Sequence, residues 1–125
     1  MTGSILIVSD DLAIVRIIGE NLTAVGHTVT AAHEGMDIQH HCLTGQCDII
    51  ITEAMLPYLD GEALLKAMHT ADTSAEMIVL ARSEMLEAAD LYVKNGAYDV
   101  LLVPEEISHP RRIQALVQHA LEISK

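Results

Sequence analysis

The sequence predicts an α/β fold, a doubly wound parallel sheet of the (βα)5 type. Short and nearly uninterrupted apolar runs alternate five times with longer segments of helical period. Three of the runs are almost purely apolar, which is typical of strands covered on both faces. This order favours a parallel sheet with helices on both faces, joined by right-handed crossovers.

The expected elements follow one another along the chain with their own boundary signals. The strands are predicted at Ile5–Val8, Thr28–Ala32, Asp48–Thr52, Met77–Ala81 and Val100–Val103. The first helix is predicted from apolar side chains that share one face, namely Ile14, Ile17, Ile18, Leu22 and Val25. Gly26 is expected to end that helix, and Asp60 to cap a third one. Gly96 follows the fourth helix, and Pro110 lies in the first turn of the fifth, where its missing N–H costs little.

Length and composition indicate one domain, residues 1–125, with an aliphatic core. Half of the residues are apolar, while Trp and Phe are absent. The formal net charge of -11 repels phosphates, so neither nucleic acid nor an anionic membrane surface is an expected partner. No apolar stretch reaches the ~18 residues that span a bilayer, and two cysteines fit a reducing compartment. A cytoplasmic location is therefore expected.

Acidic residues follow two of the predicted strands. The first strand ends in Ser9, Asp10 and Asp11, and the third ends in Glu53. In a doubly wound sheet, ligands collect beyond the carboxyl ends of the strands, where the strand order reverses. The sequence therefore places these carboxylates together on one edge of the sheet. A simpler interpretation is that the two aspartates only cap the first helix.

Nearly the whole chain resembles the receiver domains of two-component response regulators, which have a flavodoxin-like fold. The matching stretches are ILIVSDD, DIIITEAMLPYLDG and NGAYDVLLVP, of which the M-L-P-x-x-D-G portion is the most specific. In this family the peptide before the last of these prolines is commonly cis, which predicts a cis Val103-Pro104 bond. A single-domain regulator and a segment of a longer kinase or transcription factor both fit such a chain.

The resemblance also assigns the functional positions of the family, and most of them carry other residues here. The acidic pair falls on Ser9 and Asp10, with Asp11 beside them, and the phosphoacceptor aspartate falls on Glu53. The remaining positions are the switch hydroxyl at Ala81, the switch aromatic at Val100 and the lysine at Val103. The resemblance implies a degenerate receiver, or pseudo-receiver, whose Glu53 is inactive as a phosphoacceptor. We expect no enzymatic activity.

Each of these replacements weakens the phosphoryl chemistry of the family. Phosphoryl transfer relies on positioning and on neutralisation by Mg²⁺ and a cation. Glu53 is one methylene longer than aspartate, and a misplacement of about 1 Å costs on the order of a hundredfold in rate. Asp10, Glu53 and the Met55 carbonyl still offer oxygens for Mg²⁺, so weak binding is expected but no cofactor is required. Glu53 is also a poor imitation of phospho-aspartate, because it carries one negative charge where a phosphoryl group carries about two.

The resemblance then points to protein contacts as the basis of function. The expected contact surface is formed by the fourth helix, the last strand and the fifth helix, with Tyr92, Tyr98, Leu101, Arg111 and Arg112. The partner is expected to be a histidine kinase, an output domain or a second copy in a homodimer. Two alternatives stay open. One is an active receiver that accepts a phosphoryl group from a histidine kinase, and the other is a small-ligand-binding flavodoxin-like domain.

Overall fold

A parallel sheet forms the centre of the molecule in the computed structural model, which describes residues 2–32, 47–53, 55–56, 59–60, 65–66 and 75–124. Its strands are β1 (Ser4–Val8), β2 (Thr28–Ala32), β3 (Ile49–Glu53), β6 (Glu76–Ala81) and β7 (Asp99–Leu102). Their order is β2-β1-β3-β6-β7, and every pair is parallel. The predicted doubly wound fold is confirmed, with the order reversing between β1 and β3.

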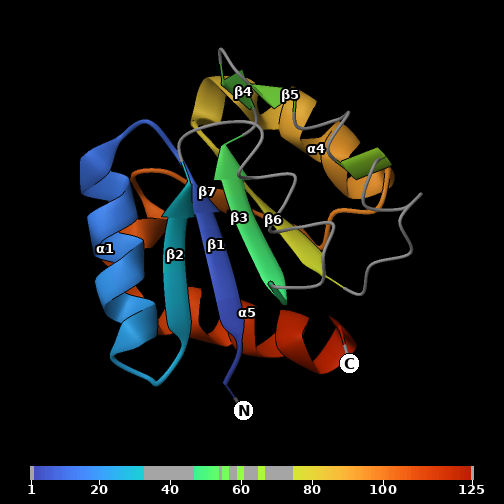
Figure 1. Ribbon diagram of the computed structural model, residues 1–125. Helices are drawn as coiled ribbons and strands as arrows, with labels where there is room; N and C mark the ends of the chain where they lie inside the picture. Colours follow the sequence, from blue (N-terminus) through green and yellow to red (C-terminus); the bar gives the residue numbers. More distant parts are fainter. Residues whose placement is uncertain are drawn as a thin grey trace.

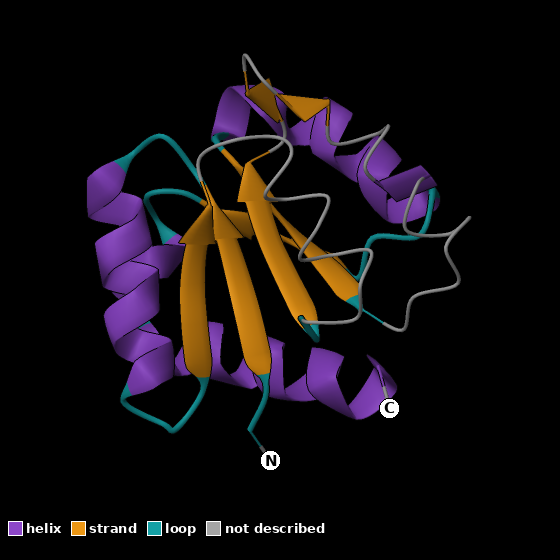
Figure 2. Cartoon of the chain, in the orientation of Figure 1, coloured by secondary structure: helices purple, strands orange, loops and turns teal. Residues whose placement is uncertain are grey.

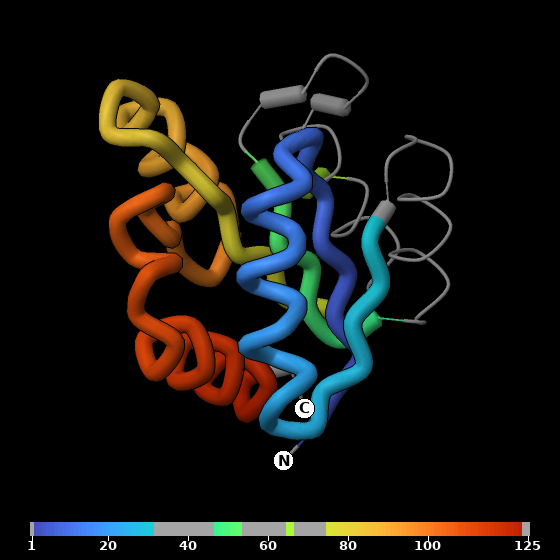
Figure 3. Tube along the Cα trace, turned by 90° about the vertical axis from the view of Figure 1, so that its left-hand side faces the viewer, coloured from blue at the N-terminus to red at the C-terminus, as the bar shows by residue number. Residues whose placement is uncertain are grey.

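Helices cover both faces of this sheet (Figure 2). The described helices are α1 (Leu12–Thr23), α4 (Leu86–Lys94) and α5 (Pro110–Ser124), with the short 3-10 turns η1 (Ser83–Met85) and η2 (Glu106–Ser108). Figure 3 shows α1 in front of the sheet, between α5 and the edge strand β2. The helices α1 and α5 contact each other on one face, whereas α4 packs against β6 and β7 on the other.

The strands divide their side chains between two apolar layers. In β1, Ile5 and Ile7 face α1 and α5, whereas Leu6 and Val8 belong to the layer that includes Ala89 of α4. This alternation follows from the two-residue period of a strand. Because both faces are covered, the central strands β1, β3 and β6 are almost wholly apolar and buried, whereas the edge strand β2 carries exposed Thr28 and Thr30.

The helix boundaries agree with most of the sequence signals. Gly26 and Gly96 adopt φ of 97° and 115° just after α1 and α4, a region that L side chains rarely occupy. Pro110 is the first residue of α5, and the Val103-Pro104 peptide is cis, as the resemblance predicts. On α1 only Ile14 and two further apolar residues are buried, and the predicted inclusion of Ile17 and Val25 is wrong.

The chain after β3 departs from the prediction. Residues Met55–Leu56 form β4 and Leu59–Asp60 form β5, and the two pair as a small antiparallel ladder. Asp60 thus ends a strand, and most of the residues expected to form the next helix lie outside the described part of the chain. No helix among the described residues is long and apolar enough to cross a membrane.

One histidine is buried at the amino edge of the sheet. His27 precedes β2, its side chain is only 5% exposed, and its Nδ1 accepts a hydrogen bond from the Gly3 N–H at 3.1 Å. Burial lowers the pKa of His27 below its ordinary value of 6.5, because the charged imidazolium loses hydration. The folded state therefore favours the neutral ring.

This burial predicts a loss of stability in mild acid. Because the pKa of His27 is lower in the folded state, the unfolded chain binds more protons than the folded chain near pH 6. The contribution of the neutral His27 to the free energy of unfolding is therefore complete above pH 6.5, and it declines as the pH falls toward the folded-state pKa. We expect a smaller fall in Tm between pH 7.5 and pH 5.5 for His27→Gln than for His119→Gln, a matched change at an exposed position. Equal falls in the two variants would contradict the assignment.

Candidate functional site at the carboxyl edge of the sheet

The side chains of Ser9 and Glu53 meet where β1 and β3 end. The pairing of Val8 with Thr52 brings the next residue of each strand to the same edge. The Ser9 hydroxyl donates a hydrogen bond to Glu53 Oε2 at 2.6 Å, and Ser9 is fully buried. Ser9 Oγ also accepts the Asp11 N–H at 3.0 Å. The predicted convergence is therefore confirmed for these positions, with a specific contact that spacing could not reveal.

Asp11 combines two roles at this edge. Its Oδ1 accepts the N–H groups of Ala13 at 3.0 Å and Ile14 at 3.4 Å, which caps α1. Its Oδ2 lies 3.7 Å from Nη2 of Arg82, the residue that follows β6. Such a half-exposed ion pair is worth about 0–1 kcal/mol, so it positions Arg82 more than it stabilises the fold.

Arg82 is a cation at this edge for which the sequence predicted no role. The sequence does contain a feature that places Arg82 at the site: it directly follows a predicted strand, and so lies at the edge of the sheet where the carboxylates are expected. Asp10 is exposed here as well, and Met55 lies in β4. Among the described residues, no three His, Cys, Asp or Glu side chains are grouped as a metal ion would require.

The positions assigned to the switch and to the lysine are apolar and mostly enclosed. Ala81 and Val103 are both buried, and the Val103 N–H donates to the Ala81 carbonyl at 2.9 Å. Val103 belongs to the layer on the α5 side, whereas Val100 is half-buried and packs on the α4 side. None of the three side chains can donate a hydrogen bond or carry charge.

The profile of the response regulator receiver domain matches residues 5–117. The chain belongs to this family. As a receiver domain it is 27% identical over 119 residues to the transcriptional regulator NtrC of Escherichia coli K12, covering 95% of this chain and 25% of NtrC. It is 29% identical over 105 residues to YkoG of Bacillus subtilis, an uncharacterized transcriptional regulatory protein, covering 84% and 46% of the two chains.

Solved receiver structures show the same fold. Full-length FixJ of B. japonicum superposes with a TM-score of 0.87 at 24% identity, covering 98% of this chain and 59% of FixJ. The receiver domain of the Francisella response regulator 1452 gives a TM-score of 0.76 at 27% identity, with 94% and 98% of the chains covered. This receiver domain spans a quarter to about half the length of the relatives NtrC and YkoG.

The residues predicted to form a contact surface do not all share one face of the receiver. Leu101 is buried, 1% exposed, because alternation along β7 directs it under α5, so its inclusion was wrong. Arg111 lines a cavity on the side of α5 that faces the turn after α1, about 100° around the helix from Arg112. Tyr92 and Tyr98 are half-buried against opposite apolar layers.

Arg112 is engaged within the domain. Its Nε lies 2.7 Å from Glu106 Oε2, and Nη2 lies 3.9 Å from Asp99 Oδ2. Glu106 Oε1 also accepts the Leu102 N–H at 2.9 Å. Burial opposes ionisation of Glu106, but the hydrogen bonds from Arg112 and Leu102 outweigh it and hold the pKa of Glu106 below its ordinary value. Arg112 thus links the start of α5 to Glu106 of η2 and to Asp99, the first residue of β7.

Proposed function

We propose that this receiver domain signals without phosphorylation at Glu53 and acts by contact with other proteins. The hydrogen bond from Ser9 to Glu53 Oε2 is the observation that carries the proposal. It ties the carboxylate at the acceptor position to a buried hydroxyl, where a reactive carboxylate would need to meet an incoming phosphoryl group. Glu53 in this receiver is a fixed structural acid.

The surroundings of Glu53 support the same proposal. Ser9 replaces a carboxylate of the acidic pair, so it contributes no negative charge toward a metal ion. The buried Val103 contributes no cation to neutralise a transferring phosphoryl group, and the buried Ala81 offers no hydroxyl to detect one. A phosphoryl group on Glu53 would therefore find no side chain at these positions that binds it in one conformation of the domain and not in the other. Without such a difference in binding, phosphorylation cannot shift the conformational equilibrium.

The donor set fits Mg²⁺ poorly. Mg²⁺ requires near-octahedral oxygen ligands and is usually held by one or two carboxylates with waters. One oxygen of Glu53 already accepts the Ser9 hydroxyl, and the Arg82 guanidinium adds positive charge beside Asp11. We propose at most weak Mg²⁺ binding, no required cofactor and no enzymatic activity.

The proposed contact surface lies over α4, β7 and the start of α5. The helix α4 carries the exposed apolar side chains Leu86, Leu91 and Val93, of which Leu91 is 57% exposed. The half-buried Tyr92 adds an aromatic ring of the kind that is enriched at interfaces. A histidine kinase, an output domain or a second copy are the partners proposed for this surface. The net charge of -11 disfavours nucleic acid and anionic membranes as partners.

An active receiver is the second candidate. Arg82 favours it, because its guanidinium supplies a cation at the edge where Glu53 ends β3 and Asp10 follows β1. An arginine there could neutralise part of the charge that the family assigns to a lysine.

Intact mass spectrometry after incubation with acetyl phosphate and Mg²⁺ separates the two candidates. We expect no phosphoryl adduct on the wild type or on Glu53→Asp, with Glu84→Asp as the matched exposed control. Sedimentation of the same samples should show one mass distribution with and without acetyl phosphate. An adduct on the wild type would establish the active receiver. An adduct on Glu53→Asp alone would show that one methylene silences a competent site, and a strict monomer that binds no partner would contradict the contact proposal.

A further inference from the structure

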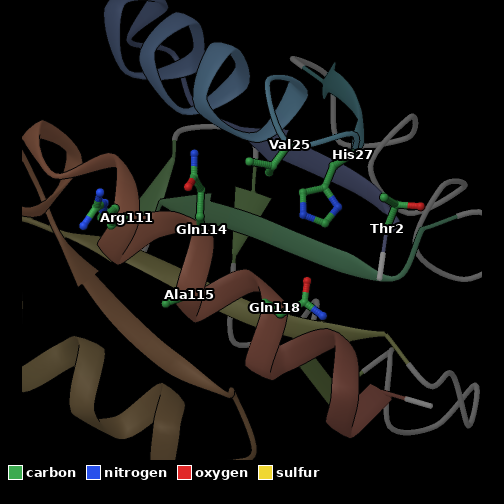
Figure 4. Close-up of a pocket in the computed structure, with 7 residues that line it drawn as sticks. All are labelled: Thr2, Val25, His27, Arg111, Gln114, Ala115 and Gln118. Atoms are coloured by element: carbon green, nitrogen blue, oxygen red, sulfur yellow. The ribbon is translucent and has the colours of Figure 1, made fainter.

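An open cavity lies at the amino edge of the sheet, opposite the edge that carries Ser9 and Glu53. It has a volume of about 410 Å³ and lies between the N-terminal segment, the turn between α1 and β2, and one face of α5 (Figure 4). Its lining residues are Thr2, Val25, His27, Arg111, Gln114, Ala115 and Gln118. The volume is within the range of about 300–1,000 Å³ that is typical of small-molecule sites.

The ring of His27 presents a hydrogen-bond donor to this cavity. Its Nδ1 accepts the Gly3 N–H, so Nδ1 has no proton in the neutral ring and Nε2 must have one. The Nε2–H has no hydrogen-bond partner within the described part of the chain. Figure 4 shows the ring above α5, facing the side chains of Gln114 and Gln118. The backbone of Gly3 therefore fixes the tautomer that a bound acceptor would meet.

The other lining side chains add donors and a positive charge. Arg111 forms no ion pair with any described residue, and it lines the cavity at the start of α5, beyond Gln114 as seen from His27 (Figure 4). Gln114 is positioned by a hydrogen bond from its Nε2 to the Asn21 carbonyl at 3.2 Å. No carboxylate is among the described residues that line the cavity, although the chain has eighteen acidic residues. A donor-rich hollow with one arginine is complementary to an anion.

We propose that this cavity binds a small oxyanion, a carboxylate or phosphate group, through Arg111 and the His27 Nε2–H. The arginine supplies charge and a planar pair of N–H groups, and His27 supplies an N–H donor whose tautomer is set by Gly3. This goes beyond the proposed signalling function, because the cavity and Glu53 lie at opposite edges of the sheet. Occupancy would join the N-terminal segment, the turn before β2 and α5.

The test is a titration of the 15N-labelled protein at pH 7.5 and constant ionic strength, with succinate in one series and inorganic phosphate in another. We expect saturable shifts of the backbone amides of Gly3, His27 and Gln118 with at least one of the probes. Arg111→Gln should weaken the binding by on the order of tenfold or more, since it removes a charged hydrogen-bond donor. Arg16→Gln, the same change at an exposed position of α1, should leave it unchanged.

Saturation by succinate alone would identify a carboxylate as the ligand class, and saturation by phosphate alone would identify a phosphoryl group. Shifts that stay linear to about 20 mM for both probes would overturn the proposal. Equal affinity of Arg111→Gln and the wild type would also overturn it, because the anion would then bind without the arginine. The exposed position of Arg111 means that its variant should retain the fold.

Discussion

Replacement of Leu101 by alanine is expected to lower the free energy of unfolding by about 2–5 kcal/mol, the range for a buried leucine. Leu101 is 1% exposed and lies in the apolar layer under α5, together with Val103 and Ile113. The truncation removes apolar contacts and leaves a cavity that the surrounding sheet and helix cannot fully close. Urea unfolding followed by circular dichroism measures the change.

Leu91→Ala provides the matched control. It makes the same chemical change on α4, where the side chain is 57% exposed, and its cost should stay within about 0.5 kcal/mol. If Leu101→Ala were as mild as Leu91→Ala, Leu101 would be a surface residue, as its inclusion in the contact surface first implied. The comparison of the two variants therefore shows whether the Leu101 side chain stabilises the folded state through its burial.

Removal of the Ser9 hydroxyl is expected to cost about 1.5–3 kcal/mol, the range for hydrogen bonds to a charged group. Ser9→Ala removes both the donor to Glu53 Oε2 and the acceptor of the Asp11 N–H, and both bonds belong to a fully buried residue. A cycle of Ser9→Ala, Glu53→Ala and the double variant should give a coupling energy of about 1–2 kcal/mol. Unfolding in urea at pH 7 measures all four proteins.

Ser83→Ala is the control for this cycle, because Ser83 is exposed and contacts its neighbour Glu84 only at 3.4 Å. Its cost should be within about 0.5 kcal/mol. A coupling energy near zero between Ser9 and Glu53 would mean that Glu53 is free to move at the edge of the sheet. Glu53 would then not be a fixed acid at the acceptor position.

The fold followed from local patterns that the tertiary structure had little freedom to alter. All-apolar runs such as Ile5–Val8 can be buried only in a sheet covered on both faces, and turns such as the one at Gly26 need a backbone region that glycine tolerates. Patterns of this kind depend on neighbouring residues only, so they can be interpreted without knowing which distant segments of the chain pack against them. The short antiparallel ladder of β4 and β5, in which Asp60 pairs with Met55, was not predicted, because it depends on the pairing of two two-residue segments.

The chemistry of the site depended on contacts between residues far apart in sequence. The sequence predicts, through the resemblance, that Ser9, Glu53 and Val103 stand where the family has other residues, and that the carboxyl ends of the first and third strands share an edge. The folded chain adds that Ser9 bonds to Glu53, that Arg82 pairs with Asp11, and that Leu101 is buried. These contacts differ from the strand pattern because a hydrogen bond forms only when the donor–acceptor distance is correct to within a few tenths of an ångström and the two groups point at each other. Sequence spacing fixes the edge on which a side chain lies, but the packing of the whole chain sets those distances.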